Sequence, residues 1–344
     1  MADFVYTLPN GDFIQNAAGD DVVTLNDTTG SLSSLQSAID SARTNNPNAF
    51  LRISLKPGAA YAVSSLPLVL GSKMCLTGNG TRIEASSTNT TATSLIRIAP
   101  GSSYVSVSNV MLNGKLAAVS GIEALGVSRV NIDNTIVRDT GLAGIFLEGL
   151  GGTVFDSQLS ISHCDVAGSA NNAGIHLKNT TQAVCMENSS ARNATGILLD
   201  GVSRATIFNN QCLSNSAVGL ALSANSTSTF VIHNLISNST TGISTDTTTQ
   251  RNIIASNEVR SATTGIAIAG TVQTLHDNIF PSGVTSPVST ASSNHHIITT
   301  SAGFTTSGQN YFYPPTKAND HSATIISGKS NANLTTNATT TSEI

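Results

Sequence analysis

The chain has 344 residues, a net charge of −4 and only 10% charged residues. Its scattered basic residues form no nucleic-acid footprint, and no apolar run approaches the ~20 residues of a transmembrane helix. Ser, Thr, Asn and Gly fill the polar positions between periodic Ile, Val and Leu, which is typical of a repetitive β protein. We therefore expect neither nucleic-acid nor membrane partners.

Residues 1–100 are expected to contain a lead-in, a capping helix and the first coils of a repeat. Turn signals dominate residues 1–30, and the segment Ser31–Asn45 is the predicted helix. Its apolar residues share one face, and Ser31 is the candidate N-cap. An amphipathic helix here would cover the exposed end of a stack of strands.

The first residues, Met1-Ala2-Asp3-Phe4, lack the basic and apolar regions of a signal peptide. Stacked coils with polar turns, as expected for this chain, are commonest in exported proteins. We therefore expect a secreted or extracellular protein whose leader is missing from this sequence, with a cytoplasmic protein as the alternative.

Seven Gly-Ile or Gly-Leu pairs recur through the middle of the chain, beginning at Gly121, Gly144, Gly174, Gly196, Gly219, Gly242 and Gly265. A nearly fixed period of about 23 residues predicts stacked units that cannot bury their apolar faces alone. Apolar and polar residues alternate after each glycine, as in a strand with one inward face. A unit of this length holds three short strands, so residues 101–285 are expected to form a parallel β-helix.

The 30-residue step between Gly144 and Gly174 indicates an insertion, around Gly149–Gly152 and Gly168–Asn172. Beyond Pro281 the period is lost. Residues 286–344 are therefore expected to form an irregular C-terminal cap or tail of the same domain. This segment could alternatively serve assembly, which leaves a homo-oligomer such as a trimer open.

Two sets of recurring residues are interpreted as structural. The cysteines show neither CxxC pairing nor zinc spacing, so we expect small core residues, with a disulfide as the alternative; they are Cys75, Cys164, Cys185 and Cys212. Five asparagines that precede the glycines by eight to twelve residues are expected to form a ladder of stacked amides in a turn; they are Asn109, Asn134, Asn188, Asn234 and Asn257.

The ordered pattern of the N-terminal third resembles the start of pectate-lyase-like right-handed β-helix proteins. The similarity rests on the run Ser34–Ala42, the turn Pro57-Gly58, Tyr61 and the segment Leu76–Gly80. It implies a right-handed, single-stranded, all-β solenoid with a short N-terminal capping helix. This superfold includes lyases, hydrolases, epimerases and tailspikes, so it leaves the function open.

Charged residues concentrate on the strands that begin at the glycines. The residues two and four positions after each glycine point outward, and in the first four coils they include Glu123, Phe146, Glu148, His176, Lys178 and Asp200. Later coils have Ser and Ala there, apart from Asp246. Glu148, Lys178 and Asp200 are expected to form a column at ~4.8 Å spacing, with His176 beside Lys178. Ordinary cross-strand ion pairs are the alternative explanation.

We interpret this column as a glycan-processing site that needs no cofactor. The predicted catalytic residues are Glu148, Asp200, Lys178 and His176. The predicted substrate-binding residues are Glu123, Phe146, Arg138 and Asp246; Arg138 is included because it shortly precedes Gly144, although a local ion pair would also explain it.

Three functions compete. Glycosidic-bond cleavage or transfer in a poly- or oligosaccharide ranks first, because Glu148 and Asp200 could flank the bond. A polysaccharide lyase ranks second, with Lys178 or His176 as the base. Two neighbouring carboxylates stabilise the charged form of Lys178 and make it a poor base, but Ca²⁺ held by Glu148 and Asp200 would remove this effect. A non-catalytic solenoid, such as an adhesin or tailspike shaft, ranks third, and the scarcity of aromatic residues favours it.

Overall fold

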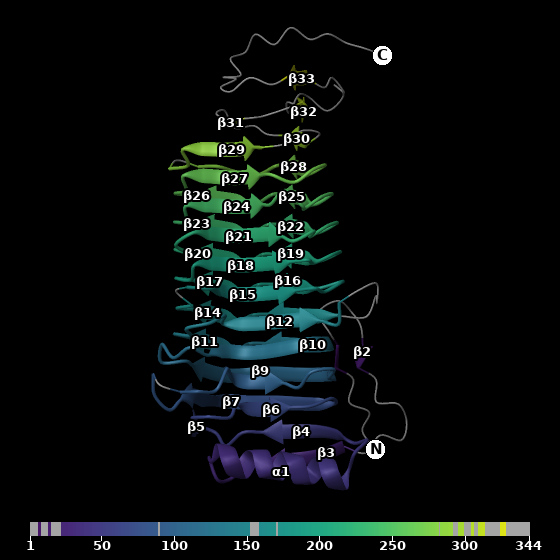
Figure 1. Cartoon of the computed structure of the whole chain (residues 1–344), viewed down its shortest axis with the longest axis vertical. Coiled ribbons are helices and arrows are strands. Elements are labelled where there is room, and N and C mark those ends of the chain that lie inside the picture. Colours follow the sequence, from purple (N-terminus) through teal and green to yellow (C-terminus); the bar gives the residue numbers. More distant parts are fainter. Residues whose placement is uncertain are drawn as a thin grey trace.

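The computed structural model describes residues 6–7, 13–14, 22–88, 90–151, 158–169, 171–281, 283–291, 295–298, 304–305, 309–313 and 324–327. The chain winds into a right-handed parallel β-helix of about 11 turns (Figure 1), so the predicted fold class is confirmed. Strands of successive coils pair in parallel, and they form three sheets that run along the stack.

The first sheet contains the strands that follow the recurrent glycines. It consists of β6 (Leu68–Leu70), β8 (Ser94–Ile98), the first part of β10 (Ser120–Asp133), β12 (Ile145–Gly149), β15 (Ala173–Lys178), β18 (Thr195–Asp200), β21 (Val218–Ser223), β24 (Thr241–Thr245), β27 (Thr264–Ile268), β29 (Ser286–Thr290) and β31 (Phe304–Thr305).

The second sheet contains the rest of β10 and the strands β3 (Val22–Asn26), β4 (Phe50–Ser54), β7 (Met74–Ala85), β9 (Ser103–Asn113), β13 (Leu159–Ser162), β16 (Val184–Met186), β19 (Thr206–Phe208), β22 (Phe230–Ile232), β25 (Ile253–Ala255), β28 (Thr274–His276), β30 (His296–Ile298) and β32 (Gln309–Tyr313). The strand β33 (Thr324–Ser327) pairs antiparallel with β32.

The third sheet contains the later parts of β7 and β9 and the strands β5 (Ala60–Val63), β11 (Ile136–Arg138), β14 (Asp165–Ala167), β17 (Ser189–Ala191), β20 (Gln211–Leu213), β23 (Leu235–Ser237) and β26 (Glu258–Arg260). A separate antiparallel pair is formed by β1 (Tyr6–Thr7) and β2 (Phe13–Ile14).

The recurrent glycines are required by close packing between coils. A Cβ added to Gly219 would overlap the side chain of Ile236 and would lie 2.7 Å from the carbonyl oxygen of Gly242, the equivalent glycine of the next coil. Other glycines of the series meet similar obstacles. Each coil can therefore approach its neighbour only where a side chain is missing, which explains the period in the sequence.

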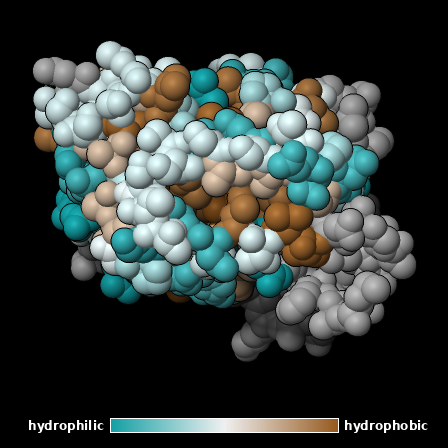
Figure 2. Space-filling model, turned by 90° about the horizontal axis from the view of Figure 1, so that it is seen from below, coloured by the Kyte–Doolittle hydropathy of each residue, from teal (hydrophilic) through white to brown (hydrophobic). Residues whose placement is uncertain are grey.

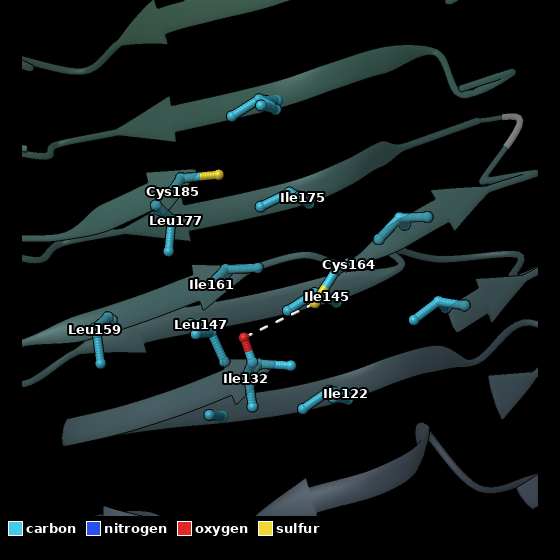
Figure 3. Close-up of a cluster of buried hydrophobic side chains, with 14 of the residues drawn as sticks. Ile122, Ile132, Ile145, Leu147, Leu159, Ile161, Cys164, Ile175, Leu177 and Cys185 are labelled. Atoms are coloured by element: carbon cyan, nitrogen blue, oxygen red, sulfur yellow. Dashed lines mark hydrogen bonds between the residues drawn. The ribbon is translucent and has the colours of Figure 1, made fainter. Parts of the chain in front are cut away.

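The core is a set of side-chain stacks that run along the axis (Figure 3). In the first sheet, Ile122, Ile145 and Ile175 follow one another in register, and all three are fully buried. The thiol of Cys164 lies 3.8 Å from the carbonyl oxygen of Ile132. All four cysteines are buried and none of them forms a disulfide, so their prediction as core residues is confirmed and the disulfide alternative is wrong.

The helix α1 (Leu32–Asn45) covers the lower end of the stack (Figure 1), as predicted. Its residues Leu35, Ile39 and Ala42 are buried against the first coil. Ser31 occupies the N-cap position, but its hydroxyl makes no capping bond. Seen from this end, the surface is mostly hydrophilic, with hydrophobic side chains gathered near its centre (Figure 2). Among the described residues, no helix is both long and apolar enough to cross a membrane.

The asparagine ladder exists, but two of its predicted members lie elsewhere. The buried ladder runs through Asn188, Asn210, Asn234, Asn257 and Asn278, each main-chain N–H donating to the side-chain oxygen of the next. Asn109 and Asn134 lie one position earlier in their turns, in the left-handed backbone region, and form a separate side-chain hydrogen bond. A one-residue offset in the turn therefore moves the amide out of the core.

Some expectations concern residues outside the described ones. They include most of the lead-in before Val22, Gly152 of the insertion, and most of the C-terminal segment 286–344.

Candidate functional site

The predicted column of charged residues is confirmed in register. Glu148 at the end of β12 pairs with Lys178 of β15, and Lys178 pairs with Asp200 of β18. The alternate residues of these strands, such as Ile145 and Leu147, are fully buried, so the charged side chains project from the outer face. The first sheet therefore presents three ionisable groups on three successive coils, about 4.8 Å apart.

Glu148 is held by two donors. The Nζ atom of Lys178 lies 3.4 Å from its Oε1, and Asn179 donates a hydrogen bond of 2.8 Å to the same oxygen. Asn179 follows β15 in the left-handed backbone region, which asparagine tolerates well. Sequence reasoning missed Asn179, although an asparagine directly after a strand is a recognisable turn signal.

His176 lies on the same face, packed between neighbouring coils. Its ring is 4.9 Å from that of Phe146 on β12, and 16% of its side chain is exposed. The Nε2 atom is buried, has no hydrogen-bond partner and lies 3.7 Å from Oδ2 of Asp200. Burial lowers the pKa of His176, while Asp200 opposes this effect. The imidazole is therefore neutral at pH 7.

Glu123 lies two coils before His176 in the same row, as predicted, because it pairs with Phe146, which pairs with His176. Its carboxylate binds Arg97 of β8 at 3.0 Å. Arg97 is the residue that sequence reasoning missed here, since its coil precedes the first glycine of the series. The alternation Ile96-Arg97-Ile98, with the arginine in the outward position, was the available signal.

Two predicted substrate-binding residues lie apart from this group. Arg138 belongs to β11 of the third sheet, where its guanidinium binds the carboxylate and the main-chain oxygen of Asp165. Asp246 follows β24 and accepts hydrogen bonds from the main chain of Ala224 and from Thr248. Burial opposes ionisation of Asp246, but these donors keep its pKa below the ordinary value. Both side chains are engaged in local structure.

A metal centre does not emerge from the described residues: nowhere in them do three His, Cys, Asp or Glu side chains form a group that could hold an ion. The cysteines are sealed in the core, and burial raises the pKa of Cys164 and Cys212 to about 12. Neutral buried thiols of this kind are poor metal ligands.

A model of the NosD family, described as periplasmic copper-binding protein, matches residues 68–317. No curated protein sequence matches the chain significantly. Among solved structures, DFA-IIIase from Arthrobacter chlorophenolicus A6 in complex with GF2 is similar, with a TM-score of 0.62 and 14% identity over 80% of this chain and 93% of that one. The A-module of the Azotobacter vinelandii mannuronan C-5 epimerase AlgE4 has a TM-score of 0.58 and 18% identity, covering 87% and 96%. At these identities the likeness shows the fold.

Proposed function

The chain belongs to the NosD family, and we propose that it is a carbohydrate-active enzyme that cleaves or transfers glycosidic bonds on the outer face of its first sheet. The observation that carries this proposal is the pair formed by His176 and Asp200. A neutral imidazole, 16% of whose side chain is exposed on this face, has its buried Nε2 3.7 Å from the Asp200 carboxylate. Further support comes from the structural neighbours, which are carbohydrate-active β-helix proteins.

The charges on this face favour a neutral sugar over a polyuronate. Lys178 is paired with Glu148, and Arg97 is paired with Glu123. Asp200 has no Lys or Arg partner among the described residues. Two cations therefore face three carboxylates, and a substrate carboxylate would meet a negative surface without a free cation. This balance supports our proposal of cleavage or transfer rather than elimination.

In the proposed mechanism His176 is the general base. Nε2 is buried beside Asp200, so the other ring nitrogen, Nδ1, accepts the proton of the attacking hydroxyl, which belongs to water in hydrolysis and to a sugar in transfer. Asp200 then stabilises the imidazolium across the 3.7 Å gap. The ammonium group of Lys178, oriented by Glu148, gives a proton to the leaving oxygen as the glycosidic bond breaks, and proton exchange with water then returns His176 and Lys178 to their starting states. Glu148 and Asp200 lie two coils apart, about 9.6 Å between backbones, and each faces one of these groups: Glu148 faces Lys178 and Asp200 faces His176.

Elimination from a uronide is the second candidate, and the neutral imidazole of His176 beside Lys178 favours it. His176 would take the C5 proton, but the substrate carboxylate needs a cation that is not already paired. Ca²⁺ between Glu148 and Asp200 would supply that charge. A lyase of this kind would therefore lose its activity in a chelator.

Copper, which the family description names, finds no group of three suitable donors in the described part of this chain. Copper prefers histidine nitrogen and the sulfur of cysteine or methionine. All four cysteines are buried in the core, and no cluster of three metal-binding side chains is present among the described residues. No step of the proposal uses copper. The periplasmic description of the family does support an exported location, which we include in the proposal.

The test is a panel of neutral and uronic oligo- and polysaccharides, read by new reducing ends and by the absorbance of unsaturated uronides. We expect reducing ends without that absorbance, or a transfer product with few reducing ends. His176→Gln should lower kcat at least 100-fold, the usual contribution of a general base, and Asp200→Asn should lower it as well.

Glu258→Gln is the matched control, because it removes a carboxylate from an exposed ion pair on the third sheet. Both site variants should keep the melting temperature of the parent. If the absorbance of unsaturated uronides appears and is abolished by a chelator, the reaction is Ca²⁺-assisted elimination rather than cleavage or transfer. If nothing in the panel is turned over, the enzyme proposal is wrong and a non-catalytic binding solenoid is the better description.

A further inference from the structure

A second polar cluster occupies the outer face of the first sheet, on the side of His176 nearer α1. Arg97 pairs in register with Glu123, Glu123 pairs with Phe146, and Phe146 pairs with His176. Adjacent strands are about 4.8 Å apart, so Glu123 lies about 10 Å from His176 along the axis and Arg97 about 14 Å. One continuous row thus connects this cluster to the reacting pair.

The cluster holds Glu123 with four donors that all reach the same oxygen. Its Oε2 accepts from Arg97 Nε and Nη2 at 3.1 and 3.0 Å, from the hydroxyl of Thr93 at 3.0 Å and from that of Ser94 at 3.3 Å. Ser94 is fully buried, and Glu123 exposes only 17% of its side chain. None of these donors occupies Oε1. The carboxylate is therefore fixed in orientation while keeping one oxygen as an acceptor.

An ordinary surface ion pair in the same chain looks different. Arg82 lies 3.7 Å from Glu84 on the third sheet, with 54% of the Arg82 side chain exposed. Such pairs contribute little to stability and need no further explanation. Glu84 also binds Lys115 at 2.8 Å, so distance alone does not distinguish Glu123. The buried hydroxyl of Ser94 and the four donors that meet at one oxygen do, and they indicate a more rigid arrangement, which suits recognition.

The chemistry of the cluster matches neighbouring hydroxyl groups. Arg97 is a donor only, and the free oxygen of Glu123 is an acceptor only. A sugar hydroxyl can accept from the guanidinium while the next hydroxyl donates to the carboxylate. The charges of the pair cancel, so a uronate would gain no net attraction. The Phe146 ring, in the next position of the row, offers an apolar surface to the C–H groups of the adjoining unit.

We propose that Arg97 and Glu123 form a distal subsite for a neutral sugar unit, and that the glycan lies along the long axis of the β-helix between this subsite and His176. The inference rests on the proposed function, because it uses His176 as the reacting end. It predicts that binding strengthens once the substrate is long enough to span the ~10 Å from His176 to Glu123.

The experiment compares a length series of the neutral oligosaccharide that the parent turns over. In Arg97→Gln and Glu123→Gln, we expect KM for the longer members to rise about tenfold, because a charged hydrogen bond is lost, with kcat nearly unchanged. The shortest members should show parent values. Arg82→Gln is the matched control and should leave both parameters unchanged. Circular dichroism checks the fold of each variant.

Equal changes for short and long members, or no change for either, would overturn the subsite while leaving the proposed function intact. Binding of the neutral panel to His176→Gln, measured by calorimetry, separates the two ideas. If the parent turns over nothing but Arg97→Gln on that background still weakens binding about tenfold, the subsite holds and the proposed reaction is wrong. If no neutral oligosaccharide binds, both are wrong.

Discussion

Replacing one buried asparagine of the ladder should destabilise the protein more than its small size suggests. Asn234 is 1% exposed. Its side-chain oxygen accepts from the main-chain N–H and the amide of Asn210, at 2.9 and 3.0 Å. Its side-chain nitrogen donates to the carbonyl of Ile207 and to the side chain of Asn257, both at 2.9 Å. Asn234→Ala removes all of these contacts at once.

The magnitude follows from the groups left behind. The N–H of Asn210 loses the partner described above in a place that water does not reach, and an unsatisfied buried donor costs about 1–3 kcal/mol. Loss of the other amide contacts adds about 1 kcal/mol more. We therefore expect Asn234→Ala to lower the free energy of unfolding by roughly 3 kcal/mol.

Urea denaturation followed by circular dichroism measures this loss. Asn45→Ala is the matched control, because Asn45 is an exposed residue at the end of α1. We expect the control to stay within about 0.5 kcal/mol of the parent. If Asn234→Ala also stays within that range, the ladder does not hold adjacent coils together as argued, because the surrounding structure or an entering water replaces its hydrogen bonds without loss.

Three further outcomes are expected. Gly219→Ala should lower the melting temperature, at a cost of about 2 kcal/mol from overpacking against Ile236; an unchanged value would contradict the close packing of coils. Hydrogen bonding to Asp133 raises the pKa of His163, although burial opposes it. The ion pairs of protonated His163 therefore stabilise the fold fully below the unfolded pKa of about 6.5. This stabilisation is lost as pH rises through the raised pKa of the folded state. Asparagine tolerates the left-handed backbone at this position, so His163→Asn should lower the free energy of unfolding by about 0.5 kcal/mol at pH 6 and by almost nothing at pH 9. Equal losses at both pH values would contradict a stabilising role for the ion pairs. Finally, because burial lowers the pKa of His176, kcat/KM of the parent should stay level down to below pH 6.5; a decline that begins at higher pH would exclude His176 as the base.

The register of the candidate site could be predicted because the repeat itself fixes it. Glycine is required once per coil by close approach, and side chains alternate at period two along the strand that follows. Counting from each glycine therefore predicts Glu148, Lys178 and Asp200 in one column, as the register has them. The column spans the 30-residue coil, because β12 and β15 pair without a shift in register.

Arg97 escaped prediction because its coil lacks the glycine. The register aligns Ser94 with Ser120 and Ile96 with Ile122, so Leu95 stands where the other coils have glycine. Leu95 is fully buried. A search that uses the glycine as its marker therefore starts one coil too late and misses the partner of Glu123.

The pairing of charges could not be predicted either, since register brings Lys178 equally close to Glu148 and Asp200. The structure resolves the choice through Asn179, whose amide binds the same oxygen of Glu148 as Lys178 does. The neutrality of His176 depends on its burial against Phe146, a contact across coils rather than along the chain. Both effects arise from side-chain conformation, which period and alternation do not specify.

The two directions along the first sheet offer a bound glycan different surroundings. Toward α1 the outward row carries Phe146, Glu123 and Arg97, three side chains with shape and charge. Beyond β18 the same row continues through the small residues Ala221, Ser244 and Ala267. A glycan along this face would therefore be selected by its units on the α1 side of His176 and tolerated on the other. Small outward residues also contribute nothing to the core, so enlarging them there should affect substrate length preference without affecting stability.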